Sequence, residues 1–403
     1  MRLYDCLVRC LAGGVVLAML VSGATGTSAQ VPNSSSGRLD AALVASTVTE
    51  VAAIVAREYM DAEAGRRFAD ALIRGSAGRR YRPQTASQLA ERLTRDLFEQ
   101  SRDKHLAVTL VQRTLPGGTA VPSREEQVRQ ANAGVQRVEV LPGNVGYLNL
   151  TAFWRTNEAR DVIATAMSLL ARADALILDM RENNGGTPET VAFLASYLFA
   201  DRAVPLFDIV ARTGASVPYE ASANPLGDET RPVFVLTSSR TFSAGEGFAF
   251  LMQEQRRATI VGERTAGAAN PGQRYPVNEI FEVIVPTGRI RSAVLGANWE
   301  GRGVIPDIAA KAGDALRIAL DRARAMGQAA ADLRDPPRSP ELVSPVRPLA
   351  RRQPPVRCPS PVMSPGQFDA AAELVDFRAQ RVELLVPVRK VPGRHHPDPM
   401  CKK

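Results

Sequence analysis

Apolar side chains return every three or four positions between Asp40 and Gln100, which is the spacing of helices that bury one face. Gly75 to Arg80 and Pro83 interrupt this pattern, as turn residues do. The pattern therefore predicts a small N-terminal bundle of about three helices within residues 38–112.

A looser stretch over 113–137 follows the bundle. It contains Pro116-Gly117-Gly118 and Pro122, and it is too short to hold a further domain of ordinary size. We interpret it as a linker.

From residue 138 on, short apolar runs alternate with helical patterns. The runs predict strands at 138–141, 145–150, 175–180, 233–237, 260–262 and 282–286, and the patterns between them predict helices at 157–172, 188–199 and 244–254. Repeated alternation of strand and helix predicts an α/β core with a largely parallel sheet over 138–312.

The chain ends in one more helical pattern and a tail. Residues 313–333 predict a last helix, with Asp314 near its start. Residues 334–403 are rich in Pro, Arg and Ser, which favours disorder, although 370–385 has the pattern of one further helix.

The first 29 residues have the pattern of a secretory signal peptide. Arg2 and Arg9 precede an apolar run at 11–21, and small residues lead to a cleavage site after Ala29. The run is short for a membrane span, so we expect an exported protein, periplasmic or extracellular, without a stable span after cleavage. A retained anchor helix is the alternative.

Composition excludes some classes of function. The net charge is +8, but basic residues are conspicuous in the tail, and the aromatic content of 5% is poor for stacking on single-stranded nucleic acid. We therefore expect no nucleic-acid partner. The four cysteines lie in the signal or the tail, so the presumed folded region has no disulfide framework and no cysteine-based site.

Histidine is the usual base for a serine nucleophile, and the presumed folded region contains a single one, His105. A lone histidine can equally be structural. His395 and His396 in the tail are a weak signal for a metal, and we predict no metal and no cofactor.

A serine stands where a predicted buried strand gives way to a predicted helix, in the segment from Leu236 to Glu246. At such a junction a side chain is exposed, and the first amides of the helix are unpaired and favour a developing negative charge. Ser243 is therefore the candidate nucleophile. The alternative is an ordinary N-cap serine.

The segment from Leu178 to Gly186 is a second junction of this kind. Gly185 and Gly186 let the backbone approach a ligand closely and expose N–H donors. An acyl-transfer oxyanion needs two donors, which the Ala244 amide and an amide of the glycine pair could supply. A simple strand-to-helix turn fits this segment equally well.

An acidic residue, Glu300, lies beside a glycine-rich turn in the segment from Asn298 to Asp307. A carboxylate can orient a catalytic histidine and stabilise its charged form. Glu300 could have this role or could be a solvated loop residue, and its spacing does not choose between them.

Taken together, these segments resemble the tail-specific, C-terminal processing serine peptidases. The likeness is strongest to the branch that includes the tricorn core protease and the repeats of interphotoreceptor retinoid-binding protein, and it covers roughly residues 40–312. Four segments occur in the order of that family. They are 179–186, 242–246, Val261-Gly262-Glu263-Arg264-Thr265-Ala266-Gly267 and Gly303-Val304-Ile305-Pro306-Asp307.

The resemblance implies a fold related to crotonase and Clp protease, with Ser243 as nucleophile and Ala244 with Gly185 or Gly186 as oxyanion donors. One branch activates its serine with a lysine, but Ala268 stands at that position and no lysine occurs between Lys104 and Lys311. The tricorn-like branch uses histidine and glutamate, which His105 and Glu300 match.

Two departures from the family pattern are visible. No peptide-binding PDZ insertion is expected, because the stretch before the core is too short for one. Lys104 stands where the tricorn enzyme has a serine before its histidine, which puts the role of a fourth polar member in doubt.

The function implied is a serine peptidase that acts on peptides, such as exposed C-terminal stretches, through an acyl-enzyme. One rival is a non-catalytic binder of a small hydrophobic ligand or a peptide on the same fold. The other is an acyl-CoA enzyme of the crotonase type, which the secretory signal disfavours.

Overall fold

The computed structural model describes residues 37–334, apart from 83–84, 112–121, 201 and 228–229. The predicted signal peptide lies outside the described residues. So do the predicted tail from residue 335 on, its possible helix at 370–385, the four cysteines, His395 and His396. Among the described helices, none has an apolar run long enough to cross a membrane.

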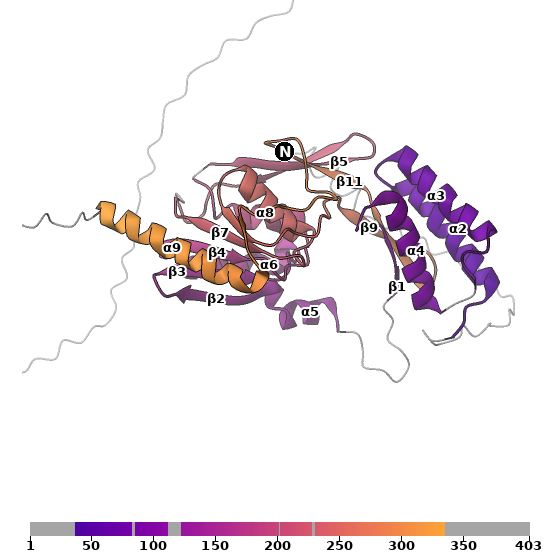
Figure 1. Ribbon diagram of the computed structural model, residues 1–403, viewed down its shortest axis with the longest axis horizontal. Coiled ribbons are helices and arrows are strands. Elements are labelled where there is room, and N and C mark those ends of the chain that lie inside the picture. Colours follow the sequence, from indigo (N-terminus) through magenta and orange to yellow (C-terminus); the bar gives the residue numbers. More distant parts are fainter. Residues whose placement is uncertain (1–36, 83–84, 112–121, 201, 228–229, 335–403) are drawn as a thin grey trace, which may run out of the picture. The chain divides into compact units, whose positions relative to one another are not determined.

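Three helices begin the described chain: α2 (Ala41–Glu58), α3 (Ala62–Ala77) and α4 (Ala86–Ser101), coloured indigo to purple in Figure 1. Asp61 separates the first two, and its side chain caps α3 by accepting hydrogen bonds from the amides of Glu63 and Ala64. Thr85 and Gln88 cap α4 in the same way. The caps explain why the predicted helical stretch divides at these points.

A small antiparallel sheet packs on these helices. Its order is β1 (Ala107–Leu110), β10 (Phe281–Pro286) and β9 (Gly272–Pro276). Val108, Phe281 and Val283 are buried in one cluster with the apolar faces of α2, α3 and α4. The interpretation of 282–286 as a strand of the parallel core was wrong, because β10 pairs instead with β1, far away in sequence.

The central sheet has six strands. Their order is β12 (Ile308–Ala309), β8 (Thr259–Gly262), β7 (Val233–Thr237), β4 (Ala175–Asp179), β3 (Val145–Leu150) and β2 (Val135–Leu141). All neighbours are parallel except β2 and β3, which form an antiparallel pair. The predicted α/β class with a largely parallel sheet is confirmed.

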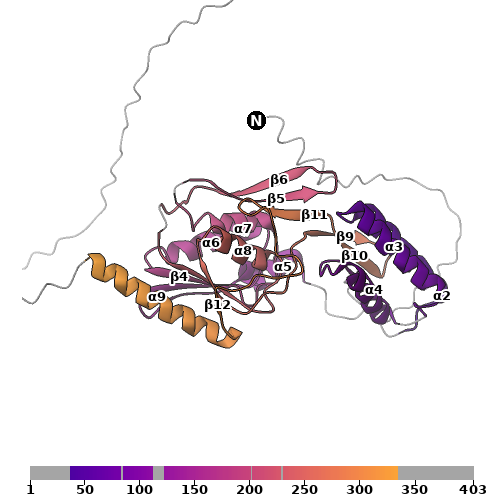
Figure 2. The same cartoon turned by 45° about the horizontal axis from the view of Figure 1, so that its top comes forward.

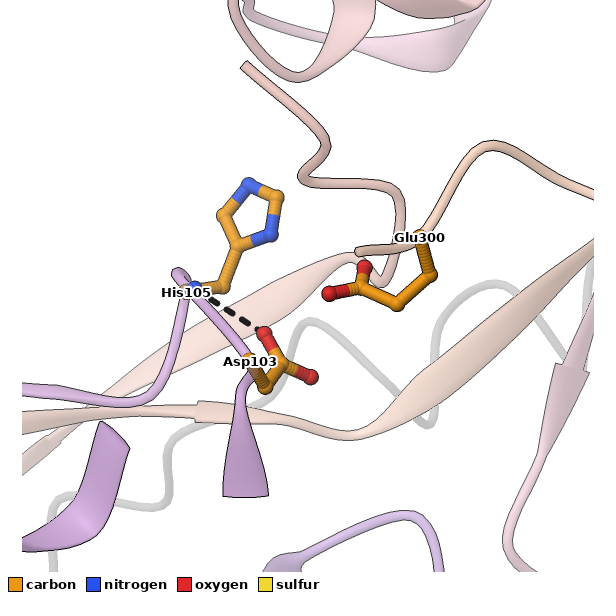
Figure 3. Close-up of side chains that lie close together, drawn as sticks. All are labelled: Asp103, His105 and Glu300. Atoms are coloured by element: carbon orange, nitrogen blue, oxygen red, sulfur yellow. Dashed lines mark hydrogen bonds between the residues drawn. The ribbon is translucent and has the colours of Figure 1, made fainter. Parts of the chain in front are cut away.

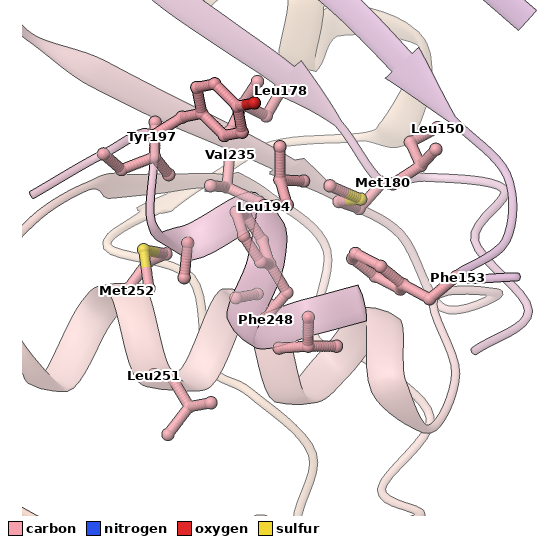
Figure 4. Packing of buried hydrophobic residues seen from close by; sticks show 14 of the residues in the cluster. Leu150, Phe153, Leu178, Met180, Leu194, Tyr197, Val235, Phe248, Leu251 and Met252 are labelled. Carbon is pink, nitrogen blue, oxygen red and sulfur yellow. The ribbon is translucent and has the colours of Figure 1, made fainter. Parts of the chain in front are cut away.

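Helices cover both faces of this sheet (Figure 2). On one face lie α6 (Thr156–Leu169), α7 (Pro188–Ala195) and α8 (Ala244–Glu254). Figure 4 shows Val235 of the sheet close to Phe248 of α8 within this core. On the other face lies α9 (Ala312–Arg334), whose buried alanines 315, 319 and 323 pack on the sheet. Burial on both faces explains why these strands are almost continuously apolar.

Several elements were not predicted. A third sheet is antiparallel, in the order β11 (Gly288–Ser292), β5 (Val204–Ala211) and β6 (Ser216–Ala221). The stretch interpreted as a linker contains the helix α5 (Arg124–Gln130), the 3₁₀ turn η1 (Asn132–Gly134) and the start of β2.

Candidate active site

Ser243 is held at the junction between β7 and α8 in a conformation that few side chains adopt. Its φ is 52° and its ψ is −119°, and such strain persists only where the surroundings enforce it. The amide of Phe242 donates to the Asn183 carbonyl at 2.9 Å, and the amide of Ser243 donates to a Glu246 carboxylate oxygen at 2.9 Å. These two bonds fix the turn on either side of the serine hydroxyl.

His105 reaches this serine from the loop between α4 and β1. Its Nε2 lies 3.0 Å from Ser243 Oγ, although 138 residues separate the two in sequence. Burial lowers the pKa of His105, against the opposing effect of the Asp103 carboxylate. A neutral imidazole is thereby favoured, and only a neutral imidazole can take a proton from the hydroxyl.

Asp103 and Lys104 tie the histidine loop to the segment 265–270. Asp103 is buried; its Oδ1 accepts from the His105 amide at 2.9 Å and its Oδ2 accepts from Asn270 Nδ2 at 3.1 Å. Lys104 donates through Nζ to the Ala266 carbonyl. Sequence reasoning missed the role of Asp103. An aspartate two residues before the histidine that it supports is the signal of an Asx turn.

Glu300 lies near His105 without being hydrogen-bonded to it. Its Oε2 accepts from the amides of Ala269 at 2.6 Å and Asn270 at 3.2 Å. Its Oε1 and the Nδ1 of His105 are buried and have no hydrogen-bond partner among the described residues. One polar atom each of Asp103, His105 and Glu300 lies within 4.8 Å of the others, and Figure 3 shows the ring and both carboxylates around one space.

The carboxyl group of Glu300 is unusually hard to ionise. Burial, with the nearby charge of Asp103 as the second cause, raises its pKa to about 7, although two backbone amides oppose the shift. Glu300 therefore titrates in the range where a serine–histidine pair has to work.

Gly185 and Gly186, the glycine pair after β4, differ in the hydrogen bonding of their amides. Gly185 donates to Asn183 Oδ1 at 2.9 Å, so this amide is already used. Gly185 also lies against the serine: a Cβ there would come within 2.7 Å of Ser243 Cβ, and its φ is +96°. Among the described residues, no hydrogen-bond acceptor pairs with the amides of Gly186 and Ala244. These two remain available to an oxyanion.

The comparisons with known proteins concern this core. Residues 144–310 match the family model of peptidase family S41. We call these matched residues the S41 domain. The predicted resemblance to tail-specific and C-terminal processing peptidases is confirmed, and the similarity supports an enzyme of the serine-type peptidase class.

Two curated relatives illustrate the match. The chain is 32% identical over 160 residues to a carboxyl-terminal-processing protease of Synechocystis sp., which is 38% of this chain and 36% of the relative. It is 32% identical over 145 residues to a tail-specific protease of Haemophilus influenzae, which is 34% of this chain and 20% of the relative. The chain thus spans less than half the length of the curated relatives reported for it, between 20% and 47%.

A solved structure supports the fold alone. A lipoprotein from Streptococcus agalactiae superposes with a TM-score of 0.51 at 13% identity, over 70% of this chain and 96% of that one. The superposition therefore extends over more of the chain than the S41 match does.

The S41 domain contains most of the site but not all of it. Ser243, Ala244, Gly186 and Glu300 lie within the matched residues. His105 lies before them, in the part of the chain that forms the N-terminal helices. The candidate base therefore reaches the S41 domain from outside the matched region.

A buried carboxylate, Glu246, organises the S41 domain around the serine. Besides the Ser243 amide, it accepts hydrogen bonds from Thr265 Oγ1 at 2.6 Å and from the amides of Gly267 at 2.5 Å and Ala268 at 2.9 Å. The next two amides along the chain are those that hold Glu300. Glu246 is thus linked to Glu300 through one short segment, and sequence reasoning assigned it no role.

Proposed function

We propose that this chain is an exported serine peptidase that cleaves peptide bonds through an acyl-enzyme on Ser243. The observation that carries the proposal is the 3.0 Å contact between Ser243 Oγ and His105 Nε2 at the N-terminus of a buried helix. The charged, apolar and small-residue pattern of residues 1–29 supports export to the periplasm or beyond the cell.

In this mechanism His105 Nε2 takes the hydroxyl proton while Ser243 Oγ attacks the peptide carbonyl. The negative charge that develops on the carbonyl oxygen is met by the amides of Ala244 and Gly186, both unpaired in the free enzyme. The dipole of α8 favours the same charge. His105 then returns the proton to the leaving amine as the peptide C–N bond breaks. In the second half of the reaction His105 takes a proton from water, the water oxygen attacks the acyl carbon, and the proton passes to Ser243 Oγ as the acid leaves.

Glu300 completes the proposed triad. His105 Nδ1 is a donor without an acceptor, and Glu300 Oε1 is a buried acceptor without a donor. A hydrogen bond between them would satisfy both atoms and stabilise the imidazolium as it forms. Catalytic hydrogen bonds are often long in free enzymes and shorten when substrate binds.

The proposed substrates are peptides or proteins with an exposed C-terminal stretch. The support is that relatives of the matched domain are named carboxyl-terminal-processing and tail-specific proteases. The proposed reaction uses no metal and no nucleotide, because the base and both oxyanion donors come from the chain itself.

The proposal is tested by treating the full chain with a fluorophosphonate probe and mapping the adduct by mass spectrometry. We expect the adduct on Ser243, with loss of labelling and of peptide hydrolysis in Ser243→Ala. Ser239→Ala, in the same loop and exposed, is the matched control and should label normally. A folded protein that gives no adduct, or an adduct elsewhere, would contradict the proposal and favour a non-catalytic binder.

A further inference from the structure

Three buried polar atoms around the candidate base have no hydrogen-bond partner among the described residues: His105 Nδ1, Glu300 Oε1 and Asn270 Oδ1. Asn270 is 2% exposed, and the other polar atom of its amide group donates to Asp103 Oδ2 at 3.1 Å. The proposed triad bond would pair two of these atoms and would leave Asn270 Oδ1 unpaired. Buried polar atoms without partners are rare in folded proteins, so several of them in one place indicate a ligand.

The carboxylates of Asp103 and Glu300 have neutral hydrogen-bond partners among the described residues. Asp103 accepts from the amide of His105 and from Asn270 Nδ2, and Glu300 accepts from the amides of Ala269 and Asn270. The two carboxylates repel each other: after burial, the charge of Asp103 is the second cause that raises the pKa of Glu300. A divalent cation between them would remove this repulsion.

The donor atoms select the metal. One imidazole nitrogen and two carboxylate oxygens are ligands of Zn²⁺, which can bind three protein ligands and a water as a tetrahedron, whereas Mg²⁺ and Ca²⁺ prefer oxygen ligands alone. Zinc bonds of about 2.0–2.2 Å place the ligand atoms about 3.4 Å apart. Ligand atoms of Asp103, His105 and Glu300, now within 4.8 Å of one another, would have to draw together by about 1 Å or slightly more. His105 and Glu300 lie outside helices and strands, where their side chains can rotate this far.

A cavity of about 980 Å³ gives an ion access to these side chains. Asp103, Asn270 and Glu300 are part of its lining. The lining includes three acidic and two basic side chains, so the cavity does not exclude a cation. Figure 3 shows the ring of His105 and both carboxylates around the space that the ion would occupy.

A metal ion on His105 Nδ1 would disable the base. Nε2 of the same ring faces Ser243 Oγ at 3.0 Å, so Nδ1 is the nitrogen left for an ion. A neutral imidazole carries one proton, and a nitrogen bonded to a metal has no lone pair to hold it. When Zn²⁺ loses a water and bonds to Nδ1, the proton of Nδ1 passes to Nε2 by way of solvent. Nε2 then donates to the serine hydroxyl and cannot take its proton.

We propose that Asp103, Glu300 and His105 Nδ1 form an inhibitory site for Zn²⁺, and that the bound ion stops the peptidase by keeping the proton on Nε2. The unpaired Asn270 Oδ1 would accept a hydrogen bond from the water that completes the zinc tetrahedron. This inference rests on the proposed function, because it makes His105 the base that the ion disables. It adds a regulator, a metal ion that the proposed reaction does not itself use.

The first measurement is Zn²⁺ binding to the full chain by isothermal titration calorimetry. The parent variant carries Ser243→Ala, and its four cysteines, His395 and His396 are replaced by serine, because these side chains also bind Zn²⁺. We expect one site in the parent. Adding Glu300→Gln or Asp103→Asn should weaken binding by about tenfold or more, and unchanged binding in both folded variants would overturn the site.

Glu254→Gln is the matched control for the binding measurement. Glu254 lies on α8 and also has buried carboxylate oxygens, but it does not belong to the group of Asp103, His105 and Glu300. The control should bind Zn²⁺ as tightly as the parent. Equal weakening by Glu254→Gln and Glu300→Gln would contradict the assignment of the ligands.

The second measurement is the rate of fluorophosphonate labelling, in the same chain with Ser243 restored and after treatment with EDTA. Saturating Zn²⁺ should slow labelling by about a hundredfold or more, because a general base contributes at least that much, and EDTA should restore the rate. Mg²⁺ at the same concentration should leave the rate unchanged. If Ser243 is labelled and Zn²⁺ does not slow the reaction, the inhibitory site is overturned and the peptidase remains. If nothing is labelled, the inhibitory role falls with the proposed function.

Discussion

Ser243 and His105, the two side chains on which the proposed chemistry depends, are held in different ways. Ser243 is fixed by residues of the S41 domain: Glu246 three residues later and Asn183 on the neighbouring strand-to-helix turn. His105 comes from a loop outside the matched residues. Its ties to the segment 265–270 are the hydrogen bonds of Asp103 and Lys104.

This difference predicts that substitutions around Ser243 and substitutions around His105 will affect different properties. The turn around the serine is part of a buried core, so damage there should appear mainly as lost stability. The histidine loop is joined to the core by a few side-chain contacts, so damage there should appear mainly as lost reactivity. Variants on the two sides can therefore be told apart by measuring unfolding and fluorophosphonate labelling together.

Among the residues that support the serine and the histidine, Glu300→Gln should have the largest effect on labelling, a decrease of about a hundredfold at pH 8, because the imidazolium loses its carboxylate. Because the pKa of Glu300 is raised to about 7, the rate of labelling should also depend on pH. Wild-type labelling should rise with pH through about 7, as Glu300 ionises. The variant should lack that step and keep only the inflection of His105, at lower pH.

Although Glu300→Gln should slow labelling, it should not lower the stability of the fold at pH 8. A carboxyl group whose pKa is raised in the folded state favours folding while it is protonated, and this contribution is lost as pH rises from its ordinary value toward 7. The glutamine keeps a carbonyl oxygen for the two amides without ionising. Its thermal midpoint at pH 8 should therefore not fall below that of the wild type, and a clear decrease would contradict this reading of Glu300.

Asn270→Ala should slow labelling by about tenfold with a modest loss of stability. The substitution removes the hydrogen bond to Asp103 Oδ2 that ties the histidine loop to the core, and small displacements of a catalytic group are costly. Asn224→Ala is the control: Asn224 is also buried, and its amide group binds the carbonyls of Tyr197 and Phe199. The control should lose stability but label at the normal rate per folded molecule.

Glu246→Gln should lower the stability of the fold much more than the rate of labelling. The glutamine would turn an amide group toward donors that now share one carboxylate, leaving at least one of them unpaired at a cost of about 2–4 kcal/mol. Labelling per folded molecule should fall only a few-fold. Urea unfolding followed by circular dichroism measures the first quantity, and a stability unchanged from wild type would argue against the organising role of Glu246.

Lys104→Ala should have the smallest effect, a loss of labelling below about threefold. Lys104 is exposed and makes a single hydrogen bond to the Ala266 carbonyl, and such surface contacts contribute little. Its position next to the base makes this a sharp test. A loss of a hundredfold would mean that Lys104 takes part in the chemistry, as the serine expected at that place in the family pattern would.

The parts of the fold that sequence predicted are those with a strong local signal. The strands β3, β4 and β7 are almost continuously apolar because both faces of the central sheet are covered. The helix α8 was predicted with its bounds because a buried strand and a serine mark its start. The sheet β11–β5–β6 was missed because two of its strands lack a continuous apolar pattern: β6 contains Pro218 and is largely exposed, and Arg289 and Arg291 alternate along β11.

The site could be predicted as a set of residues but not as a geometry. Motifs nominated Ser243, Glu300 and the glycine pair, and elimination nominated His105. The contact between Asp103 and Asn270 joins positions 167 residues apart and has no local signature. The same holds for the choice between Gly185 and Gly186 as donor, which depends on where the side chain of Asn183 points.

The most direct test of the central pairing is the second-order rate of fluorophosphonate labelling at pH 8 in His105→Ala, compared with wild type at equal folded content. The account predicts a decrease of about a thousandfold or more, because the Ser243 hydroxyl loses the group that takes its proton. A folded variant that labels at the wild-type rate would contradict the assignment of His105 as the base.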